Sequence, residues 1–513
     1  METANRIGGM KMALETKRQT LEVETLIGAQ YSQVLVRAET LVPGAGREAI
    51  EPLLAEANLT VSGADVQTDR VVLDGSAFCQ AVYRQGEETT LRALTAQATL
   101  SHVAEIAGAA PGMLSRVLAQ VEHVEAKYEN GHMVFLVTCG LRVQVLELKK
   151  EEIVDSISGV DGLQTVYEDI CSFKLAADAD AETLVKGEID LPAALDARTS
   201  LMDWGAVSVE SAEPDLGGLR VRGKVMVETL ISSGVTGRPA ALVKYPLEFD
   251  RLVELPEWLA KDAFAWVSIR RLQSQVEQSE DDALLKVEAE LQVAVQANAK
   301  DCVGALRDVY TTEGRALIAE RAQIEVCTGI DRTHVTESVR GTVLLGENAP
   351  GVGTVVAVRV RPELGQWQNE NGRGRIEGVL EATVLYMPGG SDFPAAARAE
   401  LPFSVETPGE LNDESWITVE VVSAEANALM SDRLEMKTLL NIGCETRRRS
   451  RETVVRSVEE GEPLRRRAGI VLLWPEEGET AWEIGKRYAM AVDDVTGGGA
   501  RALQPGQPVL LKL

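Results

Sequence analysis

The side chains that most often act as nucleophiles, general bases or metal ligands are few in this sequence and widely spaced. No Cys-x-x-Cys pair occurs, and no histidine stands at metal-ligand spacing from a cysteine, which argues against zinc and against a disulfide framework. We expect buried free thiols at the six cysteines: Cys79, Cys139, Cys171, Cys302, Cys327 and Cys444. The histidines also lack carboxylate or cysteine partners at a recognisable spacing: His102, His123, His132 and His334.

Sequence motifs of known catalytic chemistry are missing as well. The sequence holds no GxxxxGK[ST] phosphate loop, no GxSxG elbow and no HExxH helix. An acidic pair such as Asp493-Asp494 is too short to supply the oxygen ligands of a calcium site. The sequence therefore predicts a protein that is not an enzyme and that needs neither a metal nor a cofactor.

Binding residues are instead suggested near the C-terminus. Thr480, followed three residues later by Glu483, forms a capping box, which predicts the start of a helix. A period of 3.6 residues gives this helix one apolar face, made of Ala481, Ile484, Gly485 and Tyr488.

Two strands and a second helix are expected around the capped helix. The apolar runs Ile470–Trp474 and Val509–Leu513 predict the strands, and a second helical segment starts at Val492. The order strand, helix, helix, strand predicts a small α+β domain over residues 468–513.

This domain resembles the LysM domain. Its first loop corresponds to Gly478-Glu479-Thr480 and its last turn to Gln504-Pro505-Gly506. The resemblance implies a groove for N-acetylglucosamine-containing glycans between these two segments. Docking of a protein would instead depend on side chains of the helix, namely Trp482, Lys486, Arg487 and Tyr488. The chain departs from the family in having Glu479 for Asp, Ala481 for Leu, and glycines at 497–499 where a helix normally ends.

The rest of the chain repeats one pattern three times. In each copy a glycine is followed eleven residues later by a second one: Gly75 and Gly86, Gly223 and Gly234, Gly378 and Gly389. An earlier small residue precedes the first glycine by 36 or 37 positions: Ala38, Gly187 and Gly341. The apolar run between the paired glycines predicts a strand that ends in a turn.

Each copy closes with a strand of period two. Apolar residues alternate with polar ones over Met133–Val145, Leu285–Val295 and Leu434–Cys444, and Asn130-Gly131 predicts a hairpin turn. The alternation indicates antiparallel sheets with one packed face and one face in water. The predicted fold is therefore mainly β: three tandem antiparallel β-sandwich-like modules over residues 20–150, 151–300 and 301–446.

The segments between the modules differ in composition. Helix formers over residues 151–173 and 301–323 predict helical connectors at the starts of the second and third modules. Thr446–Ala468 carries eight arginines against four acidic residues, which predicts a solvated, flexible linker over residues 447–467. Contact of these arginines with an anionic membrane is a weaker alternative, because the neighbouring acids dilute the charge.

The overall charge excludes some partners. Asp and Glu number 79 against 52 Lys and Arg, a net charge of -27. Such a surface repels the phosphates of nucleic acids, so we expect no nucleic-acid partner. The N-terminus is polar, and no apolar run approaches the roughly 20 residues needed to cross a bilayer. We therefore expect a cytoplasmic protein.

With three repeats ahead of a LysM-like domain, the chain resembles the DUF3794/LysM family of spore coat morphogenetic proteins (SipL- and SpoVID-like). Shared segments include Leu26-Ile27-Gly28, Ala110-Pro111-Gly112-Met113 and Asp308-Val309-Tyr310. The resemblance implies a mother-cell scaffold at the forespore surface, whose LysM-like domain binds the ATPase of the coat basement layer while the β modules engage other coat proteins. The alternative is a protein that binds the glycan of peptidoglycan through the LysM-like domain.

Overall fold

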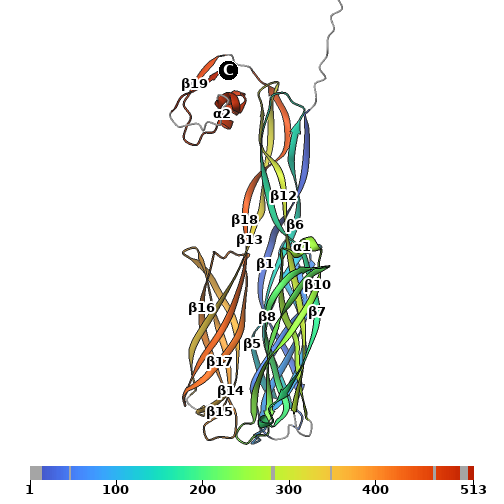
Figure 1. Cartoon of the computed structure of the whole chain (residues 1–513), viewed down its shortest axis with the longest axis vertical. Helices are drawn as coiled ribbons and strands as arrows, with labels where there is room; N and C mark the ends of the chain where they lie inside the picture. The colour runs from blue at the N-terminus through green and yellow to red at the C-terminus, as the bar shows by residue number, and fades with distance from the viewer. Residues whose placement is uncertain are drawn as a thin grey trace, which may run out of the picture.

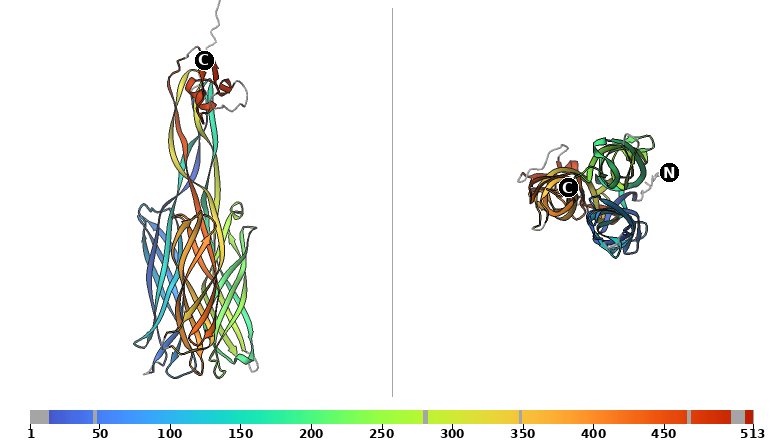
Figure 2. Two further views of the ribbon diagram at one scale, coloured as in Figure 1. Left: turned by 90° about the vertical axis from the view of Figure 1, so that its left-hand side faces the viewer. Right: turned by 90° about the horizontal axis from the view of Figure 1, so that it is seen from below.

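A computed structural model describes residues 14–44, 48–278, 283–346, 349–465, 469–496 and 507–512. Three β units stand side by side around a common axis, a long stalk rises from one end of them, and a small C-terminal domain lies at the stalk tip (Figures 1 and 2). The prediction of a mainly β chain is confirmed.

The first β unit consists of two three-stranded antiparallel sheets, with strand orders β1-β6-β5 and β2-β3-β4. Its strands are β1 (Glu15–Leu41), β2 (Ile50–Gln67), β3 (Arg70–Gln85), β4 (Arg92–Glu105), β5 (Leu114–Glu129) and β6 (His132–Ser158). The predicted hairpin turn joins β5 to β6, and both of its residues, Asn130 and Gly131, have positive φ angles of 50° and 86°. Such angles are those of a tight hairpin turn.

The second and third β units repeat this arrangement, with the sheets β11-β12-β7 and β10-β9-β8, then β13-β18-β17 and β14-β15-β16. The second unit contains β7 (Leu163–Leu191), η1 (Ala193–Leu195), β8 (Ala197–Asp215), β9 (Gly218–Ser233), β10 (Ala240–Glu254), α1 (Glu257–Ala260), β11 (Ala263–Gln278) and β12 (Ala283–Thr311). The third contains β13 (Arg315–Leu344), β14 (Val352–Glu370), β15 (Arg373–Pro388), β16 (Ala395–Thr407), β17 (Trp416–Met430) and β18 (Arg433–Pro463).

The repeated glycines occupy one structural position in all three units. Gly75, Gly223 and Gly378 each face a register shift in the neighbouring strand. A Cβ atom there would lie 2.3, 2.2 and 2.3 Å from a backbone carbonyl oxygen of that strand. Only glycine permits this approach of two backbones at a β-bulge. The second glycine of each pair directly follows the end of β3, β9 or β15, as predicted.

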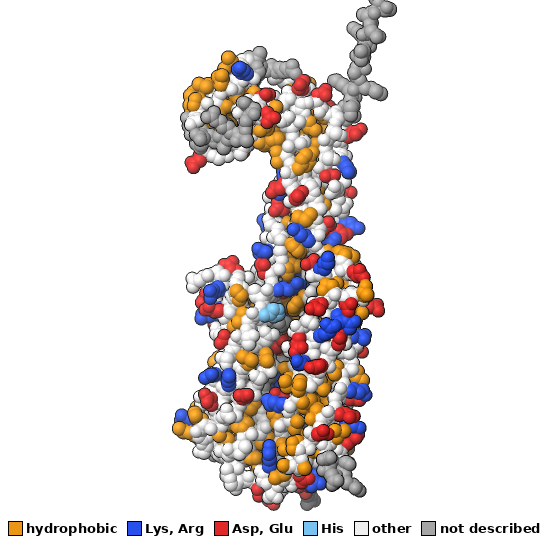
Figure 3. Space-filling model, in the orientation of Figure 1, with side chains coloured by type: hydrophobic (Ala, Val, Ile, Leu, Met, Phe, Trp, Pro, Cys, Tyr) orange, Lys and Arg blue, Asp and Glu red, His pale blue; other side chains and the backbone are white. Residues whose placement is uncertain are grey.

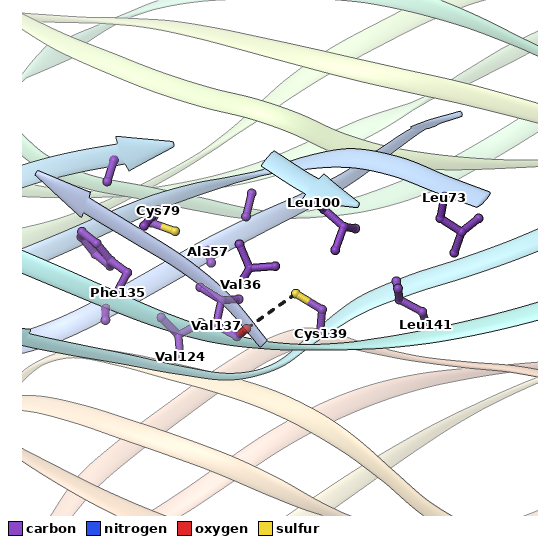
Figure 4. Close-up of a cluster of buried hydrophobic side chains, with 14 of the residues drawn as sticks. Val36, Ala57, Leu73, Cys79, Leu100, Val124, Phe135, Val137, Cys139 and Leu141 are labelled. Carbon is purple, nitrogen blue, oxygen red and sulfur yellow. Dashed lines mark hydrogen bonds between the residues drawn. The ribbon is translucent and has the colours of Figure 1, made fainter. Parts of the chain in front are cut away.

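Each unit has its own apolar core between its two sheets. In the first unit, the predicted alternation of β6 places Phe135, Val137 and Cys139 inside with no exposed surface. Figure 4 shows these side chains converging with Cys79 of β3. Burial raises the pKa of Cys79 to about 12 and that of Cys139 to about 11. These thiols therefore stay protonated and pack as small apolar groups.

The long strands leave the units and build the stalk. The outer parts of β1/β6, β7/β12 and β13/β18 pair as three two-stranded ribbons, which coil around each other (Figure 1). The prediction of helical connectors at 151–173 and 301–323 is wrong, because these residues lie in β6, β7, β12 and β13. The apolar residues there do not follow a helical period but point into a shared stalk core: Ile153, Val154, Ile170, Val303, Ala305, Leu306 and Val309 are buried.

The prediction of free thiols holds for Cys79, Cys139, Cys327 and Cys444, which are all buried. It is wrong for Cys171 and Cys302, which form a disulfide. The two are direct partners across β7 and β12, with Cα atoms 4.1 Å apart. A sequence separation of 131 residues hid this pairing, because it depends on the ribbon register.

Two polar clusters join the three units along their axis. The lower one lies at matching positions of β2, β8 and β14, where Arg359 donates to the buried Glu56 and lies over the Trp204 ring at 5.3 Å. Burial disfavours the charge of Glu56, but Arg359 and Arg361 outweigh it, so the pKa of this carboxyl is lowered. The three units therefore carry different residues at this level, and an ion pair and a cation–π contact join them.

The upper cluster lies where the units meet the stalk. Glu24 of β1 is fully buried and accepts a hydrogen bond of 2.7 Å from the Leu175 amide of β7. The same carboxylate pairs with Arg447 of β18 at 2.8 Å. Arg449, whose side chain is 9% exposed, binds Glu414 at 2.5 Å.

The predicted linker over residues 447–467 is therefore wrong as far as Pro463, since β18 continues to that residue. Strand alternation turns Arg447 and Arg449 inward, where Glu24 and Glu414 neutralise them. Guanidinium groups that are 2% and 9% exposed and already paired with carboxylates cannot meet a membrane surface, so the membrane alternative does not apply to these two arginines. Arg466 and Arg467 lie outside the described residues.

We predict that Arg447→Met destabilises the protein by about 3 kcal/mol, since it leaves the Glu24 carboxylate buried without its nearest cation. The matched control is Arg448→Met, because the Arg448 side chain is 64% exposed and pairs with Asp331 on the surface. We expect the control to change stability by less than about 1 kcal/mol. Chemical denaturation of both variants measures the difference, and two equally small losses would contradict a buried role for Arg447.

Candidate docking site of the C-terminal domain

The C-terminal domain, here called the head, spans residues 469–512. Its elements are β19 (Ile470–Leu473), α2 (Ala481–Tyr488), α3 (Val492–Thr496) and β20 (Val509–Lys512). β19 and β20 pair antiparallel, so the described elements follow the predicted order of strand, helix, helix, strand. The head has a small core of its own, formed by Ile484, Met490, Val495 and Leu511.

The capping box that begins α2 is confirmed. The Thr480 side chain accepts a hydrogen bond from the Glu483 amide at 3.3 Å, and the Glu483 carboxylate accepts one from the Thr480 amide at 2.8 Å. The Thr480 hydroxyl also donates to this carboxylate at 3.0 Å. Hydrogen bonds from the Thr480 amide and hydroxyl lower the pKa of Glu483. The Thr480 side chain is thus engaged within the head.

The head lies against the tip of the stalk, where hydrophobic side chains gather between the two (Figure 3). The Trp482 indole donates a hydrogen bond of 2.8 Å to Asp308 of β12. The Lys486 ammonium reaches both oxygens of the same carboxylate, at 2.6 and 2.7 Å. Arg321 of β13 approaches Asp308 from the stalk side at 2.5 Å. One carboxylate of the stalk therefore accepts hydrogen bonds from three side chains, two of them from α2, and a fourth from the Val309 amide at 2.9 Å.

A tyrosine two residues further along β12 completes the contact. The Tyr310 hydroxyl donates to the Met490 carbonyl of the head at 2.8 Å. Its ring meets the Trp482 ring edge-on, with centroids 4.7 Å apart, a favoured aromatic arrangement. Burial and the nearby Asp308 carboxylate raise the pKa of Tyr310 to about 12, so the hydroxyl keeps its proton. We call Asp308, Tyr310 and the α2 residues that they touch the docking site.

The glycine within α2 is explained by this contact. A Cβ atom at Gly485 would lie 2.4 Å from the Tyr310 hydroxyl oxygen. Glycine in a helix interior costs roughly 1 kcal/mol relative to alanine. The sequence predicts Gly485 on the apolar face of the helix but does not explain why this residue lacks a side chain. The close approach of Tyr310 explains it.

The site residues predicted from the sequence divide into three groups. Trp482 and Lys486 bind the stalk, as described above. Arg487 pairs with Glu479 at 2.5 Å, and Tyr488 packs against the core of the head. Gly478 adopts a positive φ of 83° in the loop before α2. The other half of the predicted glycan groove, Gln504, Pro505 and Gly506, lies outside the described residues.

Sequence reasoning missed the stalk side of the docking site. In the sequence, Asp308 and Tyr310 belong to a segment that resembles a known family, and that segment is predicted to lie in a helical connector. The signal that could have found them is the strand pattern of Asp308-Val309-Tyr310. Val309 is buried in the stalk core, so its two neighbours must face the opposite side of the strand.

Comparison with known proteins gives one family. Residues 50–129 match the family model "SipL, SPOCS domain". The matched segment begins with the first residue of β2 and ends with the last residue of β5, so it covers a large part of the first β unit. This match supports a SipL-like spore coat family and indicates a sporulation-related protein. No curated protein and no solved structure matches the chain.

Two further properties concern the part of the chain that the structure describes. Its longest helix, α2, has 8 residues, and none of the described helices is long and apolar enough to cross a bilayer. Within the same residues, no three His, Cys, Asp or Glu side chains are grouped so that they could hold a metal ion.

We predict that acid releases the head from the stalk. Burial disfavours the charge of Asp308, but hydrogen bonds from Lys486, Trp482 and the Val309 amide outweigh it and lower the pKa of this carboxyl. A lowered pKa in the docked state adds stability above the free value of about 4, and this stability is lost as the pH falls through the lowered pKa. The charged groups that face Asp308 are Lys486 and Arg321, and both stay cationic there.

Hydrogen exchange of residues 481–488 as a function of pH measures the release. The control is Asp308→Asn, which keeps an oxygen acceptor for Trp482 but cannot pair with Lys486 as an ion. We expect this variant to be weakly docked at neutral pH and to show no further change on acidification. Identical pH profiles for the two proteins would contradict the role of Asp308.

Proposed function

We propose that the protein is a non-enzymatic scaffold in endospore coat assembly. It acts in the mother-cell cytoplasm at the forespore surface, where the LysM-like head binds the ATPase of the coat basement layer and the β units engage other coat proteins. The observation that carries the proposal is the match of residues 50–129 to the SipL SPOCS domain. The family resemblance stated from the sequence supplies the partner.

The architecture supports an adaptor. The three β units share a common axis, joined by a central apolar cluster that includes Leu54, Met202 and Ala357, one residue from each unit. The head lies at the far end of the stalk from these units (Figure 1). Surfaces at opposite ends of an elongated body can hold two partners at a fixed separation, which is what a scaffold requires.

Affinity capture with the full-length chain tests the proposal. We expect the tagged protein to capture the basement-layer ATPase, identified by mass spectrometry, from a lysate of sporulating mother cells. N-acetylglucosamine oligomers should not release it. The matched variant is Ile484→Asp, which places a charge at a fully buried position of the head core and should abolish capture because the head unfolds.

The competing function has its own outcome in the same experiment. Retention of the wild-type chain on purified peptidoglycan, with release by N-acetylglucosamine oligomers, would contradict the adaptor role of the head and favour glycan binding. Capture of the ATPase by Ile484→Asp at wild-type level would contradict the head as the binding domain.

A further inference from the structure

The docking residues occur on one ribbon of the stalk. A register shift lies at the same place in all three ribbons, after Leu306 on β12 and at the corresponding residues of β6 and β18. The residues that follow it on β12 are Asp308-Val309-Tyr310. The matching residues are Ser156-Ile157-Ser158 on β6 and Ser457-Val458-Glu459 on β18. The ribbon fold is therefore compatible with other side chains at this position. Among the three ribbons, the pair of an acidic and an aromatic residue is specific to β12.

The geometry of the pair explains what α2 recognises. Val309 points into the stalk core, while Asp308 and Tyr310 both face the head. An acidic and an aromatic side chain two residues apart lie on one face of a strand. The carboxylate accepts hydrogen bonds from both Trp482 and Lys486, and the aromatic ring lies against Trp482 and over the backbone of Gly485.

The complementary face of α2 is equally specialised. Trp482, Gly485 and Lys486 are spaced i, i+3 and i+4, so they form one patch on the helix surface. Trp482 supplies an aromatic ring with an N–H donor, Gly485 leaves space for an aromatic side chain, and Lys486 supplies a cation. A helix face that needed only to cover an apolar surface would not require an interior glycine, which weakens the helix.

We propose that the face formed by Trp482, Gly485 and Lys486 is a recognition surface for a β-strand that presents an acidic and an aromatic side chain two residues apart. Asp308-Val309-Tyr310 occupies this surface within the same chain. A coat partner that binds here presents the same pair and displaces the stalk. This last step rests on the proposed function, whereas the recognition itself does not.

Occupation by the chain's own stalk reduces the apparent affinity for such a partner. A tethered domain meets its site at an effective concentration on the order of millimolar, and only the undocked fraction of the head is free to bind. Release of the head should therefore increase the apparent affinity for an external strand of this chemistry by about tenfold or more, since the docked state no longer competes.

Two full-length variants test the recognition. Asp308→Ser/Tyr310→Ser copies the polar residues of the first ribbon and releases the head. Trp482→Ala/Lys486→Ala keeps the stalk residues and frees them from the head. The control for folding and charge is Glu459→Ser, which alters an exposed residue at the matching position of the third ribbon. We expect residues 481–488 to lose hydrogen-exchange protection in the first variant and to keep it in the control.

Mixing the two variants then tests binding between chains. The free α2 face of one should bind the vacant Asp308 and Tyr310 of the other, so that the mixture sediments faster than either variant alone. Adding Asp308→Ser/Tyr310→Ser to the second variant should abolish this association. The measurement is made at protein concentrations approaching the millimolar effective concentration of the tethered head.

Two results would overturn the inference. The first is unchanged protection of α2 in Asp308→Ser/Tyr310→Ser, which would mean that these residues do not hold the head. The second is a released head that does not associate with the vacant stalk at any concentration tested. The observed contact would then be packing that forms only because the two parts belong to one chain. Neither mixture contains a coat protein, so either of these results would leave the proposed function uncontradicted. Conversely, failure to capture the ATPase would not contradict recognition of the stalk strand by α2.

Discussion

A buried carboxylate, Glu24, binds parts of all three units at the point where they meet the stalk. It belongs to β1, accepts the Leu175 amide of β7, and pairs with Arg447 of β18. A charge without exposed surface is tolerated only when its partners replace the lost water. Those partners come from segments about 150 and 420 residues away in the chain, so the ribbons must assemble in one order before the charge is satisfied.

Differences among the repeats fix that order. Three units of one fold could in principle pack around their axis in several arrangements. At one matched level, however, Arg359 of the third unit pairs with Glu56 of the first and lies over the Trp204 ring of the second, and these contacts form only when each unit stands in its own place. Polar groups at a few buried positions of an otherwise apolar interface are a known means of specifying register. The docking residues Asp308 and Tyr310 extend the same asymmetry to the stalk tip.

Much of the fold could be predicted from the sequence because it depends on local pattern. Alternating residues such as Phe135 and Val137, the repeated Gly75, Gly223 and Gly378, and the capping box at Thr480 each report on their own element. The stalk could not be predicted in this way. Its strands expose charged residues between buried ones on a narrow ribbon, so residues 151–173 resembled a polar helix and Arg447 resembled part of a solvated linker. What identifies them as strands is pairing over more than a hundred residues, which a single sequence does not display.

The candidate site shows the same division between local and distant information. The residues that α2 contributes were identified from the helix itself, but their partners Asp308 and Tyr310 lie on another domain. Because Trp482 and Lys486 are already bonded to Asp308, their presence in the sequence indicates a binding surface without indicating that it is occupied. Because the surface is occupied, the apparent affinity of the head for a partner includes the displacement of the stalk strand. Binding there exchanges one strand for another. The head is then held at the stalk tip by the same interactions that a partner would have to reproduce.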